Sequence, residues 1–151
     1  MAKIKDIDKK ILTAMDEEDL CIPQVTKIAH KTGLPTTTVH GRLNYLKQEK
    51  VIKSYSPILE PKELGAGFMT FVLGNLEDLE HPEIACQAIA KHPFVQGVYF
   101  LVGERDILVK IRSKDLEEYR ENMKKLRKYI VGGGGIVVSE VFKDTQKFVI
   151  K

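Results

Sequence analysis

The spacing of apolar residues changes near residue 60, and this change constrains the fold more than any other feature of the sequence. Before it, apolar residues recur every three or four positions, which predicts amphipathic helices. These helices are expected at residues 6–16, from about Pro23 to Lys31, and at 35–50. After it, apolar runs typical of strands alternate with two helical segments. We therefore predict domains at residues 1–60 and 67–151, joined by a hinge at residues 61–66.

A glycine-containing turn between the second and third helices predicts a helix-turn-helix. Gly33 can take the left-handed backbone conformation that ends a helix, and Pro35 suits the first turn of the next. The stretch that follows, residues 51–61 (VIKSYSPILEP), alternates like a strand and is broken by Pro57 and Pro61. The order helix, helix, turn, helix, strand is that of a winged helix-turn-helix.

The rest of the chain predicts the order β-α-β-β-α-β, which is the ferredoxin-like arrangement. Strands are expected within residues 67–76, 94–103, 107–113 and 135–143, and helices within 81–92 and 115–130. We interpret the run Gly132–Gly135 as a flexible connection from helix to strand, and residues 147–150 as a short fifth strand. The predicted fold class is α+β, an N-terminal winged helix-turn-helix plus a C-terminal ferredoxin-like βαββαβ domain.

The outward face of the third helix carries residues that a helix needed only for packing would not require. With Val39, Leu43 and Leu46 turned inward, the outward positions hold small, hydroxylated or basic side chains. Short polar side chains can hydrogen-bond to bases, a glycine lets the backbone approach the duplex, and cations suit phosphates. We expect double-stranded DNA to contact Thr36, Thr37, Thr38, His40, Gly41, Arg42, Asn44 and Lys47. The alternative, that the threonines merely cap the helix start, leaves Gly41 unexplained.

Charge is concentrated in the same region of the chain. The formal net charge is +3, yet residues 22–59 hold six basic side chains and one acidic side chain. Residues 1–21 are net acidic, and the remainder is balanced. A basic excess confined to one segment is typical of a phosphate-facing surface, although a solvated basic face has the same charge pattern.

The sequence predicts neither an enzyme nor a metal site. The four histidines and two cysteines match no zinc-ligand spacing, and no nucleophile lies beside a general base. The glycine run lacks the Lys and Ser/Thr of a phosphate loop. No signal peptide or membrane-spanning apolar run is visible, and both cysteines suit a reducing compartment. We therefore expect a cytoplasmic protein that needs no cofactor and contacts no membrane.

Several segments, taken in order, resemble the Lrp/AsnC family of bacterial and archaeal transcriptional regulators. They are residues 6–12 (DIDKKIL), 28–46, 51–65 and 92–119, together with the closing strand that contains Lys143. The most specific is VGERD at residues 102–106, between two apolar strands. The chain departs from the family pattern at Pro35, where Ser or Thr is usual, and at Lys50, where Gly is usual. Without that glycine we predict a different helix end or a non-glycine residue in the left-handed conformation.

The resemblance implies a homodimer in which the sheets of the C-terminal (RAM) domains pack face to face, often with further assembly into octamers. It also implies a site for an amino acid or similar effector at Gly103, Glu104 and Asp106, with Ser139 from the last strand. An ordinary hairpin turn is the other interpretation of that loop. The two-fold dimer would read a pseudo-palindromic operator. Two alternatives stay open: an enzyme subunit resembling siroheme decarboxylase, and an architectural DNA-binding protein without an effector.

Overall fold

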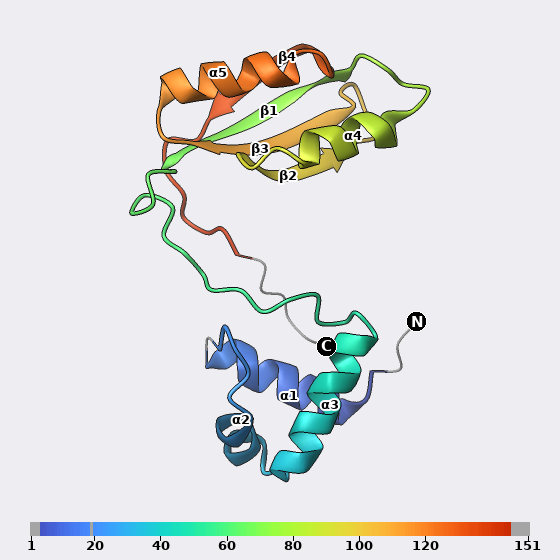
Figure 1. Ribbon diagram of the computed structural model, residues 1–151, viewed down its shortest axis with the longest axis vertical. Helices are drawn as coiled ribbons and strands as arrows, with labels where there is room; N and C mark the ends of the chain where they lie inside the picture. The colour runs from blue at the N-terminus through green and yellow to red at the C-terminus, as the bar shows by residue number, and fades with distance from the viewer. Residues whose placement is uncertain (1–3, 19, 146–151) are drawn as a thin grey trace. The chain divides into compact units, whose positions relative to one another are not determined.

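Three helices follow one another at the start of the chain, and a sheet with two further helices comes after them (Figure 1). The computed structural model describes residues 4–18 and 20–145. The chain divides into two units between Leu59 and Glu60. We call the part up to Leu59 the N-terminal unit and Glu60–Lys143 the C-terminal unit. The short strand expected at residues 147–150 lies outside the described residues.

The N-terminal unit confirms the three predicted helices. They are α1 (Asp6–Glu17), α2 (Val25–Thr32) and α3 (Thr36–Gln48). Gly33 ends α2 with φ 69°, a conformation that glycine adopts without a Cβ clash. The apolar stripes of the three helices meet in one small core of Ile11, Ala14, Ile28, Ala29, Val39 and Leu43. Burial of these stripes, rather than helix propensity alone, holds helices this short in place.

Residues 53–60 form no strand, although their alternating pattern was expected to produce a wing. Pro57 has no N–H to give to a strand ladder, and the described part of the N-terminal unit contains no other strand for pairing. Ile58 and Leu59 are both exposed. An alternating pattern alone cannot make a strand, because the backbone groups of a strand need a neighbour.

The C-terminal unit confirms the predicted ferredoxin-like order. Its elements are β1 (Phe68–Leu76), α4 (Pro82–Ala90), β2 (Val95–Phe100), β3 (Ile107–Ser113), α5 (Leu116–Leu126) and β4 (Ile130–Val137). The sheet order is β2-β3-β1-β4, and all three neighbouring pairs are antiparallel. Asp115 caps α5 by accepting a hydrogen bond from the N–H of Glu118.

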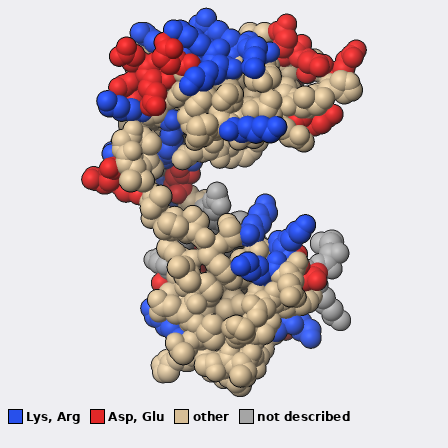
Figure 2. Space-filling model, viewed as in Figure 1, with Lys and Arg blue, Asp and Glu red and all other residues tan. Residues whose placement is uncertain are grey.

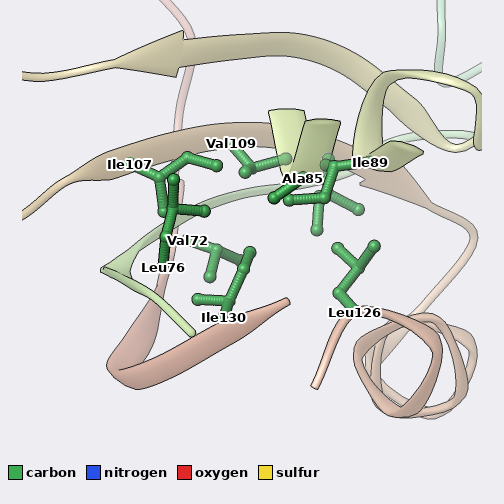
Figure 3. Close-up of a cluster of buried hydrophobic side chains, with 9 residues drawn as sticks. Val72, Leu76, Ala85, Ile89, Ile107, Val109, Leu126 and Ile130 are labelled. Carbon is green, nitrogen blue, oxygen red and sulfur yellow. The ribbon is translucent and has the colours of Figure 1, made fainter. Parts of the chain in front are cut away.

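The two helices of the C-terminal unit cover the same face of its sheet. Val72 of β1 lies opposite Val109 of β3, and both are fully or almost fully buried. Figure 3 shows Ile89 reaching toward this layer from α4 and Leu126 reaching toward it from α5. Because side chains alternate along a strand, the residues between these buried positions point to the other face of the sheet.

The glycine run belongs to strand β4, so its interpretation as a flexible connection is wrong. A Cβ on Gly133 would collide with the backbone of Leu73 in the neighbouring strand, and a Cβ on Gly135 would clash with the end of the Tyr119 side chain. The pairing of β1 with β4 is irregular between Leu73 and Asn75. Close approach of the β1 backbone therefore requires glycine at position 133, whereas a side chain at position 135 would displace Tyr119.

Candidate DNA-binding surface and effector loop

The start of α3 presents hydroxyl groups that the helix does not use as caps. Pro35 occupies the N-cap position and makes no side-chain capping bond. Thr36 and Thr37 are exposed, and Thr38 is partly buried. Capping therefore does not account for these threonines, and their hydroxyls stand at the N-terminal end of α3.

The next turn of α3 extends the same outward surface. His40, Gly41 and Asn44 are all exposed. The Asn44 side-chain nitrogen lies 3.4 Å from Nδ1 of His40. A Cβ on Gly41 would meet no atom within 4 Å beyond its own helix, so packing does not require glycine at this position. We call Thr36, Thr37, Thr38, His40, Gly41 and Asn44 the α3 outer face; it is small, polar and free of fixed charge.

Arg42 differs from the other residues expected at DNA because α1 holds its guanidinium. Nε donates to Oδ1 of Asp8 and Nη2 donates to Oδ2, each at 2.6 Å. The guanidinium carbon also lies 4.3 Å from the centre of the Tyr45 ring. The Arg42 side chain is 20% exposed and that of Asp8 is fully buried. Arg42 was expected to contact phosphate, but in the structure its guanidinium is paired with Asp8 inside the N-terminal unit.

This ion pair shifts the titration of both partners. The hydrogen bond from Arg42 is the largest cause that holds the pKa of Asp8 below its ordinary value, against an opposing effect of burial. The same contact raises the pKa of Arg42. The sequence did contain a signal: Asp8 lies four residues after Ile4 and three before Ile11, on the apolar side of α1. A carboxylate at such a position needs a partner.

Two more cations of the basic segment are paired within the N-terminal unit. Glu18, which follows α1, lies 2.6 Å from Lys27 and 2.9 Å from Lys31 of α2. Hydrogen bonds from these lysines lower the pKa of Glu18 to about 2. Half of the six basic residues in segment 22–59 are thus matched by acids from segment 1–21, which the count along the sequence could not show.

The remaining cations of that segment are at the end of α3 and after it. They are Lys47, Lys50 and Lys53, all exposed. The Lys47 ammonium lies 5.8 Å from the centre of the Tyr55 ring, which leaves it accessible to an anion. On the face drawn in Figure 2, much of the N-terminal unit is neither acidic nor basic, and its Lys and Arg side chains lie toward the edges of that face.

The end of α3 confirms the prediction for a missing glycine. Lys50 has φ 58°, and the structure describes no other non-glycine residue with a positive φ. The N–H of Val51 donates to the carbonyl of Leu46, and the N–H of Lys50 donates to that of Lys47. This pair of bonds is the Schellman ending of a helix, which places its C′ residue in the left-handed region. A lysine therefore adopts the conformation that glycine usually supplies.

The loop between β2 and β3, residues 101–106, contains three of the four residues expected at an effector. Gly103 and Glu104 are exposed. Asp106 is partly buried, and its carboxylate accepts the N–H of Leu76 at 3.2 Å, while its own N–H donates to the carbonyl of Gly74. Asp106 thus fixes the loop to the end of β1, and only its second carboxylate oxygen is left for other partners.

The same loop contains polar groups that the sequence reasoning missed. Arg105 donates through Nη1 to the carbonyl of Gly132 at 2.5 Å. Beside Gly132, Asn75 has a buried side-chain oxygen without a hydrogen-bond partner among the described atoms. Ser139 is exposed beyond the end of β4, and no described hydrogen bond joins it to the loop. The sequence did contain a signal for Asn75: it is the only polar side chain in residues 71–76 (FVLGNL), at the end of an apolar strand.

The face of the sheet opposite the helices carries several apolar side chains and is uncovered by the C-terminal unit itself, although Lys110 of β3 also lies on it, opposite Phe71. Tyr99 of β2 lies opposite Leu108 of β3, and Phe71 of β1 lies opposite Ile136 of β4. Tyr99 is 51% exposed and Ile136 is 58% exposed. These four residues, with Leu73, form what we call the open sheet face.

Other kinds of site have less support in the structure. Within residues 4–18 and 20–145, no three His, Cys, Asp or Glu side chains gather in a group that could hold a metal ion. None of the helices in that part of the chain has the length and apolar character needed to cross a bilayer. Both cysteines are free thiols.

A helix-turn-helix unit followed by a ferredoxin-like domain is also found in known transcriptional regulators. A family model described as the Lrp/AsnC ligand binding domain matches residues 72–146. The HTH-type transcriptional regulator FL11 of Pyrococcus horikoshii is 32% identical over 152 residues, which cover 98% of this chain and 97% of the relative. FL11 of Pyrococcus furiosus is 30% identical over 150 residues, with the same coverage. The chain belongs to the Lrp/AsnC family of transcriptional regulators.

Solved structures agree with this assignment at the level of the fold. An AsnC family regulator from Agrobacterium tumefaciens has a TM-score of 0.85, 22% identity and 96% coverage of both chains. A regulator from Neisseria meningitidis, solved as a complex with L-methionine, has a TM-score of 0.84 and 19% identity, covering 97% of this chain and 96% of that one. The comparisons confirm the predicted family, fold class and regulatory function. They decide against the alternative of an enzyme subunit, because the relatives are transcriptional regulators.

Proposed function

We propose that this regulator binds double-stranded DNA through the α3 outer face, as a homodimer formed by the open sheet faces, and that an amino acid bound near loop 101–106 modulates it. The observation that carries the DNA contact is the α3 outer face itself. Its hydroxyl and amide groups make no capping bonds, and Gly41 leaves bare backbone beside them. Small donors and acceptors of this kind suit base edges in the major groove.

Phosphate contacts would come from the cations that form no ion pair among the described residues of the unit. Lys47 is exposed on α3, whereas Arg42 is already engaged by Asp8. Lysine side chains beside a recognition helix position the protein on the duplex without reading its sequence. We therefore assign the phosphate contact to Lys47 and not to Arg42.

The proposed dimer follows from the open sheet face. Burying Tyr99, Leu108, Phe71, Leu73 and Ile136 against the same face of a second copy would remove these apolar side chains from water, with Lys110 among them. A two-fold dimer carries two α3 helices, so its operator would be pseudo-palindromic, with half-sites about one helical turn or a multiple apart. Further assembly, up to an octamer, would place more such pairs along the DNA.

The proposed effector is an amino acid or a closely related small molecule. Support comes from the L-methionine complex of the Neisseria relative and from the unsatisfied Asn75 oxygen beside Gly132. Arg105 and the exposed backbone of Gly103 could receive a carboxylate, and the Asn75 oxygen could receive an ammonium group. By linkage, an effector that binds one assembly state better would shift the population of states that bind DNA. The protein would act in the cytoplasm, where its DNA partner lies.

Binding of duplexes selected from a random library by the wild-type chain tests the DNA contact. Asn44→Ala should weaken binding of the selected duplex, because a base contact is lost. Lys47→Ala should weaken binding of all duplexes and reduce the slope of log K against log salt by about 0.9. Lys91→Ala removes an exposed cation in the C-terminal unit and is the matched control. If Asn44→Ala and Lys47→Ala both bind like wild type, the α3 assignment is wrong.

A thermal-shift screen of the twenty amino acids tests the effector site. The expected result is a stabilising shift with at least one amino acid and its loss in Arg105→Ala. Asp106 is a poorer position for this test, because its carboxylate holds the loop to β1. If an amino acid stabilises wild type and Arg105→Ala equally, its site lies elsewhere. If none stabilises wild type, the proposed amino-acid effector is rejected.

A further inference from the structure

We infer that Asp8 and Arg42 are positioning residues for DNA recognition: their paired hydrogen bonds fix the orientation in which α3 presents its outer face. This inference rests on the proposed role of that face. It assigns to Asp8, a residue of α1 with no exposed surface, a part in the affinity of the protein for its operator.

The contact between Asp8 and Arg42 is a bidentate ion pair, which we call the clamp. Two guanidinium nitrogens meet two carboxylate oxygens at 2.6 Å each. Parallel bonds between two planar groups restrict rotation as well as separation. The apolar contacts of Val39 and Leu43 bury α3 but are non-directional. The ion pair therefore supplies a directional contact between α3 and α1.

Both ends of the clamp are themselves held in place. Oδ2 of Asp8 also accepts the N–H of Lys5 at 2.8 Å, which ties the carboxylate to the first turn of α1. On the other side, the Tyr45 ring lies against the Arg42 guanidinium. The arginine is thus confined between a fixed carboxylate and an aromatic ring, with little freedom to swing outward.

The position of Arg42 in α3 connects the clamp to the recognition surface. Arg42 directly follows Gly41 and lies two residues before Asn44, both of which belong to the α3 outer face. A turn of α3 about its own axis would carry these neighbours away from a base edge. Asp8 would thus affect DNA recognition through Arg42, without itself contacting the duplex.

Arg42→Lys separates positioning from phosphate contact. Lysine keeps the positive charge but cannot form the two parallel bonds. If Arg42 positions α3, the variant should bind the selected duplex about tenfold more weakly, which is the size of a lost base contact. Its binding of a mixed-sequence competitor duplex and its salt slope should stay near the wild-type values, because no charge is lost. If both duplexes are bound as by wild type, the positioning role is overturned.

Asp8→Asn tests the buried partner with almost no change in shape. The neutral amide cannot hold the guanidinium as a charge pair, so the ratio of specific to non-specific affinity should fall about tenfold. The released Arg42 should also steepen the salt slope, since it becomes free to meet phosphate. A uniform loss of both affinities in folded protein would indicate damage to the unit as a whole and would also overturn the inference.

Two further variants keep the outcome clear. Glu18→Gln removes the charge that pairs with Lys27 and Lys31 of α2 without touching α3, and it should leave the affinity ratio unchanged. Asn44→Ala tests the α3 outer face itself. If neither Asn44→Ala nor Lys47→Ala has an effect, the proposed function fails. If Asn44→Ala weakens specific binding while Arg42→Lys and Asp8→Asn do not, only the positioning inference fails. Circular dichroism at the assay temperature confirms that each variant is folded.

Discussion

The C-terminal unit packs nine buried apolar residues into one core, whereas the main core of the N-terminal unit contains six and lies beside a buried carboxylate. The buried polar residues of the C-terminal unit, Thr70, Ser113 and Asn122, are neutral. In the N-terminal unit, Asp8 is ionised against Arg42, and Glu18 joins α1 to two lysines of α2. The small helical unit thus depends on charge to fix its helices, and conditions that change charge should affect the DNA-binding unit first.

The largest expected effect comes from the apolar core of the C-terminal unit. Ile89→Ala should lower its free energy of unfolding by about 3 kcal/mol, because a fully buried side chain is replaced by a cavity. Ile84→Ala on the same helix is the control, and since Ile84 is 62% exposed it should cost less than about 0.5 kcal/mol. Hydrogen exchange of the Val109 amide reports this unit, and that of Leu43 should not change. Equal effects of both variants would contradict the assigned core.

The next effect concerns the buried charge of the N-terminal unit. Asp8→Ala should destabilise that unit by roughly 2–3 kcal/mol, because it removes the partner of Arg42 and the acceptor of the Lys5 N–H. Asp6→Ala lies in the same first turn at a side chain that is 95% exposed, and it should change stability by less than about 0.5 kcal/mol. Exchange of the Leu43 amide measures both. Protection of Val109 should be unaffected, so a loss in both units would remove the contrast between them.

The glycine strand allows the same comparison within one element. Gly133→Ala should destabilise the C-terminal unit by about 2 kcal/mol, because its Cβ would collide with the backbone of β1. Gly134→Ala meets no atom within 4 Å and should be neutral or stabilising by up to about 1 kcal/mol. Thermal or denaturant unfolding of the two variants, side by side, measures the difference. Matching midpoints would show that β1 and β4 can separate at little cost.

Acid should produce the smallest effect and should act mainly on the N-terminal unit. Asp8 and Glu18 have lowered pKa values in the folded state, so the stabilisation from their ionised forms is complete above their ordinary values near 4. It is lost progressively as the pH falls, for Glu18 toward about 2. Exchange at Leu43 should therefore accelerate, relative to Val109, between about pH 4.5 and the lowest pH at which the protein stays folded. The double variant Asp8→Asn/Glu18→Gln should lose most of this dependence.

The sequence predicts secondary structure correctly where the spacing of apolar residues matches the positions that are buried in the fold. The stripes of Val39, Leu43 and Leu46 and the alternation of Ile107, Val109 and Ile111 lead directly to α3 and β3. The expected helix at 115–130 runs too far, because Ile130 continues the apolar spacing of α5 while belonging to β4. The glycine run gives no periodic signal at all. Its place in a strand depends on a neighbour, β1, that lies more than fifty residues earlier.

The candidate site likewise has one part that the local sequence predicts and another part that depends on contacts between distant residues. The α3 outer face follows from helix geometry and is visible in the sequence. The pairing of Arg42 with Asp8 joins residues 34 positions apart, so it depends on how α1 and α3 cross. Likewise, the bond from Arg105 to Gly132 and the buried oxygen of Asn75 depend on the sheet order. Local pattern predicts which residues face outward, whereas partners distant in the chain require the fold.

Lys50, at the end of α3, has a left-handed backbone conformation that lowers the stability of the helix end, but its side chain adds a positive charge there. A side chain in that conformation costs roughly 1–2 kcal/mol relative to glycine, and Lys50 accepts this cost while keeping an exposed ammonium just beyond α3. Glycine at this position would make the helix end more stable and would remove one cation from the DNA-binding unit. Lys50→Gly should therefore raise the stability of the N-terminal unit and, on the proposed function, reduce the salt dependence of DNA binding.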